Sequence, residues 1–531
     1  MFWADKIAGE MQGYQVINDS KTPSGRVHVG SVRGVIIHDI IYRALKRANQ
    51  PVKFIYGVDD YDALDTIPKY LDSTKFFPYL GFPLCNVPSP DDLASDYANY
   101  FMDEFLEVFQ YLGVTPEVYH VRDLYRTGRL NPFIDTFLQN AHLVRSVYKE
   151  VSKADRPDNW YPFQVICEQC GKIATTVVTN YNGEEVFYHC KPDGNDWVKG
   201  CGYTGWVSPF NGNGKLPWKL EWVAKWGLFG VSVELAGKDH SQKGGSRDVA
   251  NALCRNILQK KPPFHSPYEF ILVNGTKMSS SKGIGSSAIE IADLLPPELM
   301  RFLMLRTQPR SGINFSLNYD AIVRLFRDYD GLIEKYHTWE ATRTDGDGDL
   351  PEELLPLLYA QTGATVETYQ PFDFSTLISL EQIPHLQTHG EVVKRSKPLN
   401  EVDWKVLTGR IAVARKWLAG YADEDEKLVL QLDAIPEQVK EISSIQVEYL
   451  KKLTGTLELI SSWDSETIQA TLFSTSKQMD IDQAAAFKAV YLCFLGRDRG
   501  PRCGALLSYL DQDFVIARLN AVIHLRISEV I

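Results

Sequence analysis

Hydrophobic residues near the N-terminus follow two spacings that predict a strand, a helix and a second strand. Residues 14–17 form a short apolar run that ends in a polar turn. Beyond Gly30, apolar side chains recur every three or four positions as far as Ala48, which predicts an amphipathic helix. Residues 52–58 are apolar again and predict the second strand. Strand, glycine turn, helix and strand make a βαβ unit, which implies a parallel sheet.

Similar spacings extend this α/β pattern to about residue 300. They predict a helix over 216–235, whose last residues overlap a strand expected over 231–236. Further helices are expected over 97–112, 132–151 and 246–259, and a further strand over 269–273. After a polar, glycine-rich stretch at 342–349, helical spacing dominates, as over 407–421 and 482–495. The sequence therefore predicts an α/β half followed by a helical half.

Changes in composition divide the chain into five expected segments. The stretch 156–215 is rich in cysteine, glycine and short polar strands, as expected of an insertion. The expected segments are 1–155 and 216–290, the two halves of one α/β domain; 156–215, the insertion; 291–349, a helical region; and 350–531, an α-helical domain.

Length, charge and apolar content restrict the class of protein. A chain of 531 residues is too long for one hydrophobic core, so several domains are expected. No apolar run approaches the roughly 18 residues of a membrane span, and the first residues lack the pattern of a signal peptide, so a cytoplasmic protein is expected. A net charge of -11 argues against indiscriminate coating of nucleic acid. A basic cluster such as Arg301, Arg306 and Arg310 would still suit a folded RNA.

Four of the eight cysteines crowd into one stretch and form a candidate metal site. Cys167 and Cys170 make a Cys-x2-Cys pair followed by glycine, which is typical of a thiolate knuckle. Cys190 and Cys201 complete the set, with His189 as an alternative ligand. Four protein ligands leave no open position for water, so the sequence predicts structural zinc rather than a catalytic metal.

The stretch from Lys277 to Gly283 combines two lysines, three serines and a terminal glycine in a loop after a predicted strand. A lysine on a flexible stem can follow the growing negative charge of a leaving pyrophosphate. Such loops are also common as exposed polar turns. This loop alone therefore leaves function open.

A second motif, from Pro23 to Gly30, lies between the first predicted strand and its helix. Free backbone N–H groups at a helix N-terminus bind phosphates, and His28 adds an imidazole donor there. Gly237-Lys238-Asp239-His240 follows another predicted strand, and Gly244 precedes the next helix. These glycines would let a nucleotide approach the backbone, and the pair of motifs predicts a nucleotidyl-transfer site.

The His-x-Gly and Lys-Met-Ser-Ser-Ser motifs, with an α/β frame between them and a helical tail after, resemble class I aminoacyl-tRNA synthetases. More narrowly, the chain resembles the class I lysyl-tRNA synthetases. The resemblance implies an α/β Rossmann-type parallel-sheet catalytic domain with a zinc-bearing insertion, then an all-α C-terminal anticodon-binding region. It also implies lysyl-adenylate formation from L-lysine and ATP with Mg²⁺, followed by transfer to tRNA(Lys), and we expect a monomer.

The resemblance, together with the need of a buried ε-ammonium for a carboxylate and of a nucleotide for glycines nearby, assigns roles to individual residues. Catalysis would fall to His28, Lys277 and Ser279. ATP would bind, in addition, to Pro23, Gly25, Gly30, Gly244, Met278, Ser280 and Lys282. Lysine would bind to Ser20, Thr22, Asp60, Trp218, His240 and Tyr268, with Asp62 as an alternative to Asp60 for holding the ε-ammonium.

Two departures from the family pattern and three rival functions remain. Ser20 stands where the family usually has glycine, and Ser31 stands where histidine or asparagine is usual. A class I synthetase for another amino acid, such as glutamate, fits the same motifs. So do a nucleotidyltransferase or ligase without tRNA, and a zinc-containing RNA-binding module with an inactive site.

Overall fold

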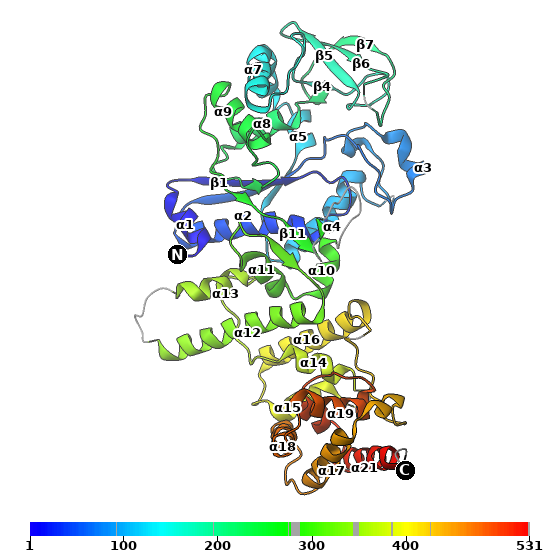
Figure 1. Ribbon diagram of the computed structural model, residues 1–531. Helices are drawn as coiled ribbons and strands as arrows, with labels where there is room; N and C mark the ends of the chain where they lie inside the picture. Colours follow the sequence, from blue (N-terminus) through cyan, green and yellow to red (C-terminus); the bar gives the residue numbers. More distant parts are fainter. Residues whose placement is uncertain are drawn as a thin grey trace. The chain divides into compact units, whose positions relative to one another are not determined.

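The βαβ unit predicted at the N-terminus is present in the computed structural model of the protein (Figure 1). β1 (Gln15–Lys21) leads into α2 (Val29–Arg47), and β2 (Val52–Val58) runs parallel to β1. β3 (Glu117–His120) adds a third parallel strand beside β2. β1 is longer than the predicted run of apolar residues, because its polar carboxyl end keeps pairing with β2 as far as Val58.

The structure describes residues 1–91, 93–194, 196–273, 276–277, 287–343, 350–383, 386–424 and 426–528. These residues form two units. The first comprises Met1–Ser316 and Gly331–Glu367, and the second comprises Leu317–Asp330 and Thr368–Ile531. Among the described helices, none combines the length and the apolar character needed to cross a lipid bilayer.

Two further parallel segments continue the sheet on the other side of β1. Val233 bridges in parallel to Ile17 and to Phe264, and β9 (Ala236–Gly237) pairs in parallel with β10 (Pro267–Tyr268). The chain thus adds strands outward from β1 as far as β3 and then returns to the opposite side of β1. In open α/β sheets, ligands bind outside the carboxyl ends of the strands at such a switch point.

The helices of the first unit largely match the predictions but differ at two boundaries. The predicted helix over 132–151 is two helices, because the chain turns at Asn140. The helix from residue 216 ends early, at Gly230, whose left-handed backbone (φ 65°) suits glycine. Before the insertion, the helices are α1 (Trp3–Glu10), α3 (Ser73–Phe76), α4 (Tyr97–Tyr111), α5 (Val121–Arg126), α6 (Asn131–Gln139) and α7 (Ala141–Ser152), with 3₁₀ turns Phe77–Tyr79 and Leu84–Asn86.

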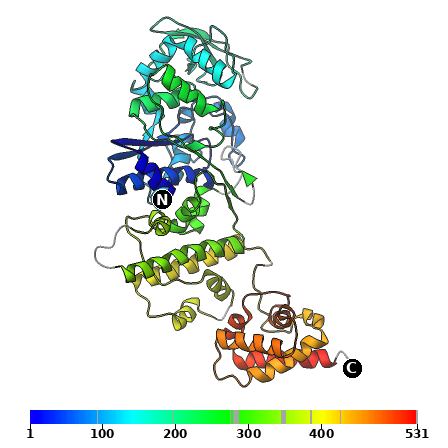
Figure 2. The ribbon, with the colours of Figure 1, turned by 60° about the vertical axis from the view of Figure 1, so that its left-hand side comes forward.

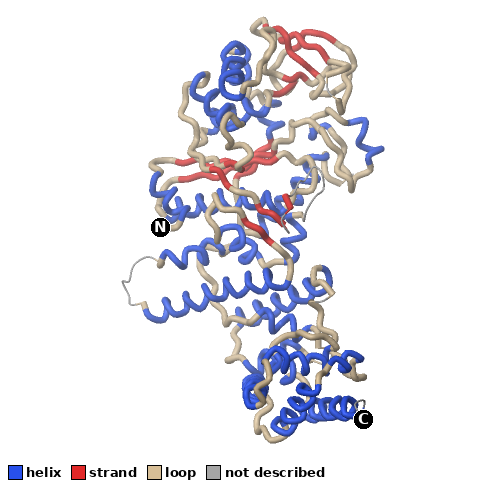
Figure 3. The backbone as a smooth tube through the Cα atoms, viewed as in Figure 1, coloured by secondary structure: helices blue, strands red, loops and turns tan. Residues whose placement is uncertain are grey.

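The expected insertion carries short antiparallel strands of its own. β5 (Thr176–Tyr181), β6 (Val186–Cys190) and β7 (Thr204–Val207) form one sheet, and β4 (Gln164–Val165) pairs with β8 (Gly214–Lys215). Figure 3 shows these strands apart from the central parallel strands. α8 (Trp218–Phe229) and α9 (Ser246–Asn256) then lead back to the central sheet.

The end of the first unit contains a small sheet and several helices. β11 (Ile271–Val273) pairs with β12 (Thr276–Lys277) and with β13 (Ile313–Phe315). The helices are α10 (Ala288–Leu294), α11 (Pro297–Leu305), a 3₁₀ turn Glu352–Leu354 and α13 (Leu355–Ala360), while α12 (Tyr319–Thr342) contains the boundary between the units.

Arg301, which the sequence placed in a basic cluster for RNA, lies in the core instead. Its side chain is fully buried, donates to the carbonyl oxygens of Tyr359 and Leu112, and pairs with Asp39 at 2.6 Å. A guanidinium with these partners stabilises the packing of α11 and is not available to a nucleic acid. The prediction that Arg301 belongs to a basic surface for RNA is therefore wrong.

The second unit has no strand among its described residues. Its helices are α14 (Phe374–Glu381), α15 (Thr388–Arg395), α16 (Glu401–Gly420), α17 (Ser444–Leu457), α18 (Ser465–Gln478), α19 (Gln483–Leu495), α20 (Cys503–Ser508) and α21 (Gln512–Ser528), with a 3₁₀ helix Glu437–Glu441. α17 packs against α18, α19 and α21, and Figure 2 shows these orange and red helices gathered in one bundle. The predicted all-helical region is confirmed.

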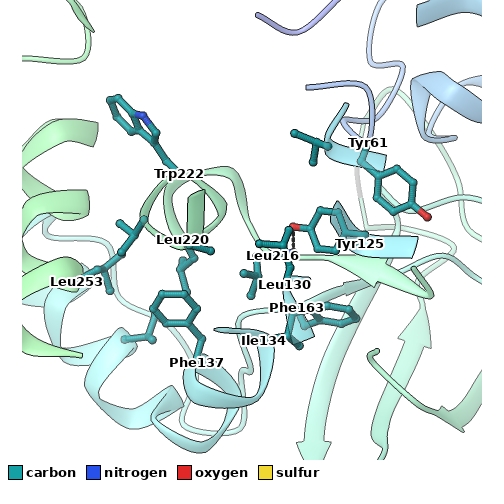
Figure 4. Packing of buried hydrophobic residues seen from close by; sticks show 14 of the residues in the cluster. Tyr61, Tyr125, Leu130, Ile134, Phe137, Phe163, Leu216, Leu220, Trp222 and Leu253 are labelled. Atoms are coloured by element: carbon teal, nitrogen blue, oxygen red, sulfur yellow. Dashed lines mark hydrogen bonds between the residues drawn. The ribbon is translucent and has the colours of Figure 1, made fainter. Parts of the chain in front are cut away.

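A large hydrophobic core holds α5 to α9 of the first unit together (Figure 4). Phe137, Leu220 and Leu253 contribute side chains from three different helices to this core. The hydroxyl of Tyr125 accepts the backbone N–H of Leu216 at 2.9 Å, which fixes the chain just before α8. This packing determines where the first turn of α8 stands.

Candidate active site

A cavity of about 430 Å³ opens near the carboxyl ends of β1, β2 and β9, at the switch point of the parallel sheet. Its wall draws on β1, the turn after β2, helix α8 and the segments around β9 and β10. The lining residues are Asp19, Ser20, Lys21, Thr22, Ser24, Asp59, Asp62, Trp218, Glu221, Trp222, Lys225, Glu234, Leu235, Ala236, Gly237, His240 and Tyr268. Its volume suits a small polar ligand.

Five of the six residues predicted to bind the amino acid line this cavity: Ser20, Thr22, Trp218, His240 and Tyr268. They come from four separate stretches of sequence. The ring of Trp218 meets that of His240 edge-on, with 5.6 Å between centroids. The structure therefore brings together residues that the sequence could associate only by resemblance.

Asp60, the sixth predicted residue, does not line the cavity. Its fully buried carboxylate accepts the backbone N–H of Arg122 at 2.8 Å and the Nε–H of Arg122 at 2.5 Å, and it lies 2.8 Å from His120. Its neighbour Asp59 and the alternative, Asp62, face the cavity instead. The expectation for Asp60 is corrected, because its carboxylate is bound within the fold.

Two buried lysines hold acidic residues of the cavity wall. Lys225 lies 2.7 Å from Asp59 and 3.3 Å from Ser20, whose hydroxyl donates to Asp59 at 2.9 Å. Lys215 contacts Asp62 and lies 3.1 Å from Glu221. Ser20, which stands where the family usually has glycine, thus places its hydroxyl between the two members of the Lys225–Asp59 ion pair.

The electrostatic consequence is clearest at Asp62. Burial alone would raise the pKa of its carboxyl group, but Lys215 and the hydroxyl of Thr22, at 2.7 Å, outweigh burial and lower that pKa. For Lys225, burial opposes the charged form, but Asp59 together with the nearby Tyr119 and Glu221 outweighs burial and raises the pKa of Lys225. The surroundings thus favour the charged forms of Asp62 and Lys225.

The His-x-Gly motif occupies the N-terminus of α2. His28 is the N-cap residue and Gly30 lies in the first turn, where backbone N–H groups lack helical partners. Pro23 and Gly25 are buried in the turn between β1 and α2. This arrangement presents backbone donors of the kind that bind phosphate.

The chain directly after the lysine–serine loop lies beside that motif. Residues 278–286, which include Met278, Ser279, Ser280 and Lys282, lie outside the described residues, as does the side chain of Lys277. The backbone of Ser287, directly after them, bridges to that of His28, and the N–H of Ala288 donates to the carbonyl oxygen of Val27 at 2.8 Å. Ser287 and Ala288 therefore lie next to the N-terminus of α2.

Gly244 does not line the cavity. It has a left-handed backbone (φ 74°), and its N–H donates to the carboxylate of Asp248 at 2.9 Å. A Cβ at this position would also stand 2.9 Å from the carbonyl oxygen of Val151. The turn before α9 accounts for this glycine without a nucleotide.

Comparison with known proteins agrees with this geometry. Residues 1–349 match the family described as "tRNA synthetases class I (K)", and residues 418–523 match the family described as "Anticodon binding domain". The chain belongs to the class I tRNA synthetases (K). The synthetase is 34% identical to the lysine–tRNA ligase of Thermoplasma volcanium, over 98% of this chain and 99% of that one.

Further relatives carry the same name. The synthetase is 32% identical to the lysine–tRNA ligases of Methanococcus maripaludis and Thermoplasma acidophilum, over 98% of this chain and 99% of each of theirs. Among solved structures, a glutamate tRNA ligase from Elizabethkingia meningosepticum covers 96% of this chain and 99% of its own, with 11% identity and a TM-score of 0.40.

The four cysteines of the synthetase insertion converge as the sequence predicted. The ligand atoms of Cys167, Cys170, Cys190 and Cys201 all lie within 4.8 Å of one another, and two of the Sγ–Sγ distances are 3.6 Å. Tetrahedral zinc with Zn–S bonds of about 2.3 Å needs sulfurs roughly 3.7 Å apart, so the cluster fits this ion. His189 is not in the cluster, and its ring meets Phe187 instead.

Sequence reasoning missed most of the charged residues in the cavity wall. Glu221 and Lys225 lie four residues apart on α8, between Trp218, Trp222 and Trp226. Opposite charges at this spacing inside a tryptophan-rich helix are a signal that could have been used, because a buried charge requires a partner. Lys215 has no comparable signal, since its partners, Asp62 and Glu221, come from the turn after β2 and from α8.

Proposed function

We propose that this synthetase joins L-lysine to tRNA(Lys), with ATP as the energy source and lysyl-adenylate as the intermediate. The main support is that this chain, over 98% of its length, is 34% identical to a protein named lysine–tRNA ligase. The match of residues 418–523 to an anticodon-binding family favours a tRNA substrate over a small-molecule ligase. The cavity at the switch point provides the space and the acidic wall for an amino acid that carries an extra ammonium group.

In the first step, the lysine carboxylate attacks the α-phosphate of ATP and pyrophosphate leaves. Phosphates would bind to the backbone around Pro23, Gly25 and Gly30 and to the imidazole of His28, because helix N-termini favour anions. Mg²⁺ would accompany the ATP as part of the substrate.

The lysine–serine loop would act on the same phosphates. Lys277 and Ser279 would stabilise the charge that develops at the α-phosphate, with Met278, Ser280 and Lys282 beside them. The return of the loop at Ser287, next to His28, supports this assignment. Gly244 would have no direct role in this account.

In the second step, a terminal ribose hydroxyl of the tRNA attacks the lysyl carbonyl and AMP leaves. The four cysteines would hold a structural zinc ion that ties β6 to the Cys167 knuckle, without an open position for chemistry. We further propose that the protein acts as a monomer in the cytoplasm.

An aminoacylation assay with total tRNA and each of the twenty amino acids tests the proposal. Lysine alone should support charging. Charging with glutamate in place of lysine would contradict lysine as the substrate, but it would still agree with a class I aminoacyl-tRNA synthetase. Formation of adenylate without any charging of tRNA would instead favour a ligase that uses no tRNA.

Variants at the two motifs test the catalytic assignment. His28→Ala and Lys277→Ala should each lower the rate of lysine-dependent pyrophosphate exchange by roughly ten- to a thousandfold, the scale of losing one charge-stabilising donor. Full activity in both variants would favour an RNA-binding protein with an inactive site. An exposed lysine outside the cavity, Lys149, supplies a matched control as Lys149→Ala.

A further inference from the structure

The cavity wall carries five carboxylates, and their partners differ. Asp19, Asp59, Asp62, Glu221 and Glu234 all line it. A bound ammonium group is stabilised most by a carboxylate that has no other cation, because the charge of the others is already neutralised or fully hydrogen-bonded. The partners of each carboxylate therefore indicate where an ammonium group binds.

Two buried lysines, Lys225 in the wall and Lys215 behind it, already hold three of the five carboxylates. Asp59 pairs with Lys225 at 2.7 Å, while Asp62 and Glu221 share Lys215. The side chains of both lysines are at most 4% exposed. Moving either ammonium away to admit a ligand would leave it buried without a counterion, which is strongly unfavourable.

Neutral donors saturate the fourth carboxylate. Glu234 accepts Nδ2–H of Asn18 at 2.9 Å and Nε1–H of Trp222 at 2.7 Å on one oxygen, and Nε1–H of Trp226 on the other. Glu234 is 3% exposed, so little of it faces a ligand. Its role is to fix the tryptophans of α8.

Asp19 is different, because the described residues supply a hydrogen-bond donor to only one of its two carboxylate oxygens. Oδ1 accepts the N–H of Ser20 at 2.9 Å, whereas Oδ2 lies 3.5 Å from Nδ1 of His38. Nδ1 of His38 lies 2.8 Å from the carbonyl oxygen of Gly34, and Nε2 of the same ring accepts the backbone N–H of Leu235. These bonds assign a neutral ring whose proton points to Gly34 rather than to Asp19.

A second group converges on the same place. A Cβ on Gly34 would stand 2.7 Å from the hydroxyl of Tyr268 and 3.4 Å from Oδ2 of Asp19, so both groups approach one point on α2. Among the residues that the structure describes, no lysine or arginine, Lys21 included, lies within 4 Å of the Asp19 carboxylate. A hydroxyl oxygen and a carboxylate without a lysine or arginine partner are acceptors of the kind that a desolvated ammonium needs.

We propose that Oδ2 of Asp19, beside the hydroxyl of Tyr268, binds an ammonium group of the amino-acid substrate. Lys215 and Lys225 keep three other carboxylates of the wall from competing for that group. This inference rests on the proposed function, in which the substrate is lysine. Lysine carries an α- and an ε-ammonium with the same binding chemistry, and the test below separates them.

The test uses the full-length Asp19→Asn variant, which removes the charge and keeps the shape. The KM for lysine should rise about ten- to a hundredfold, the scale of one charged hydrogen bond, while kcat and the KM for ATP stay within about threefold. Asp123→Asn, at an exposed carboxylate of α5 that does not line the cavity, should leave all three unchanged. Asp19→Ser repeats the measurement with a smaller side chain.

Norleucine, which lacks the ε-ammonium, separates the two ammonium groups when it is used as an inhibitor of lysine activation. If Asp19 binds the ε-ammonium, Asp19→Asn weakens lysine and leaves norleucine unchanged; if it binds the α-ammonium, both weaken alike. A lysine KM within twofold of wild type in both Asp19 variants overturns the inference. Failure of the wild type to charge tRNA with lysine would instead overturn the proposed function.

Discussion

Replacing Lys225 with methionine should destabilise helix α8 specifically. The change keeps most of the side-chain volume and removes the ammonium that lies 2.7 Å from Asp59 and 3.3 Å from Ser20. Lys225 is 3% exposed and Asp59 is 16% exposed. The variant therefore leaves a largely buried carboxylate without its cation.

The expected cost follows from that burial. Breaking a fully buried ion pair by removing one partner costs about 3–5 kcal/mol. Because Asp59 faces the cavity, water can reach it in part, and we expect about 2–4 kcal/mol. The double variant Lys225→Met/Asp59→Asn contains no unpaired charge, so it should recover most of the loss.

Native-state hydrogen exchange of peptides from α8 measures this cost locally, without assuming that the two units unfold together. A loss of about 2–4 kcal/mol corresponds to exchange that is roughly thirty- to a thousandfold faster. Peptides from α17 in the second unit serve as the internal control. The reasoning would be refuted if the single variant exchanged no faster than the double variant.

Three further predictions concern the metal cluster, a buried histidine and a close contact. Cys190→Ser should lose the bound zinc that elemental analysis of the wild type is expected to show, and full retention of metal would exclude this ligand set. Burial, aided by Arg247, lowers the pKa of His265 to about 4. Its folded-state pKa lies below the unfolded value, so this stability is present above about pH 6.5 and is lost as pH falls through 4. The loss is about 1–3 kcal/mol, and His265→Gln should flatten that part of the pH–stability curve. Gly34→Ala would place a methyl group 2.7 Å from the hydroxyl of Tyr268 and push that hydroxyl away. The KM for lysine should therefore rise while the KM for ATP stays unchanged. An unaltered KM for lysine would contradict a role of the Tyr268 hydroxyl in binding lysine.

Several features of this fold follow from local sequence. The periodicity after Gly30 gave α2 to within two residues at each end, and the apolar run at 52–58 is β2. The cysteine spacing predicted a cluster that the structure confirms. These predictions succeeded because helix periodicity, strand alternation and ligand spacing depend on residues that are close in sequence.

Other features could not be read from local patterns. Asp59, Asp60 and Asp62 are three aspartates of one short stretch, and the sequence does not distinguish their roles. In the structure, Asp60 binds Arg122, while the other two face the cavity. That difference depends on where β2 ends and on the side chain that α5 places nearby. Likewise, the break at Asn140 follows the packing of α6 and α7 against the core.

By itself, the sequence determined the family, the order of strands and helices and the residues that carry the nucleotide motifs. Only the tertiary structure decided which charges share the cavity. Lys215 meets Asp62, and Lys225 meets Asp59, across more than 150 positions of chain. A buried charge is stable only beside an opposite charge or a hydrogen-bond donor, and which partner it meets depends on how distant strands and helices pack. Among the described residues, the same packing left Asp19 without a lysine or arginine partner and so marked it as the carboxylate open to a ligand.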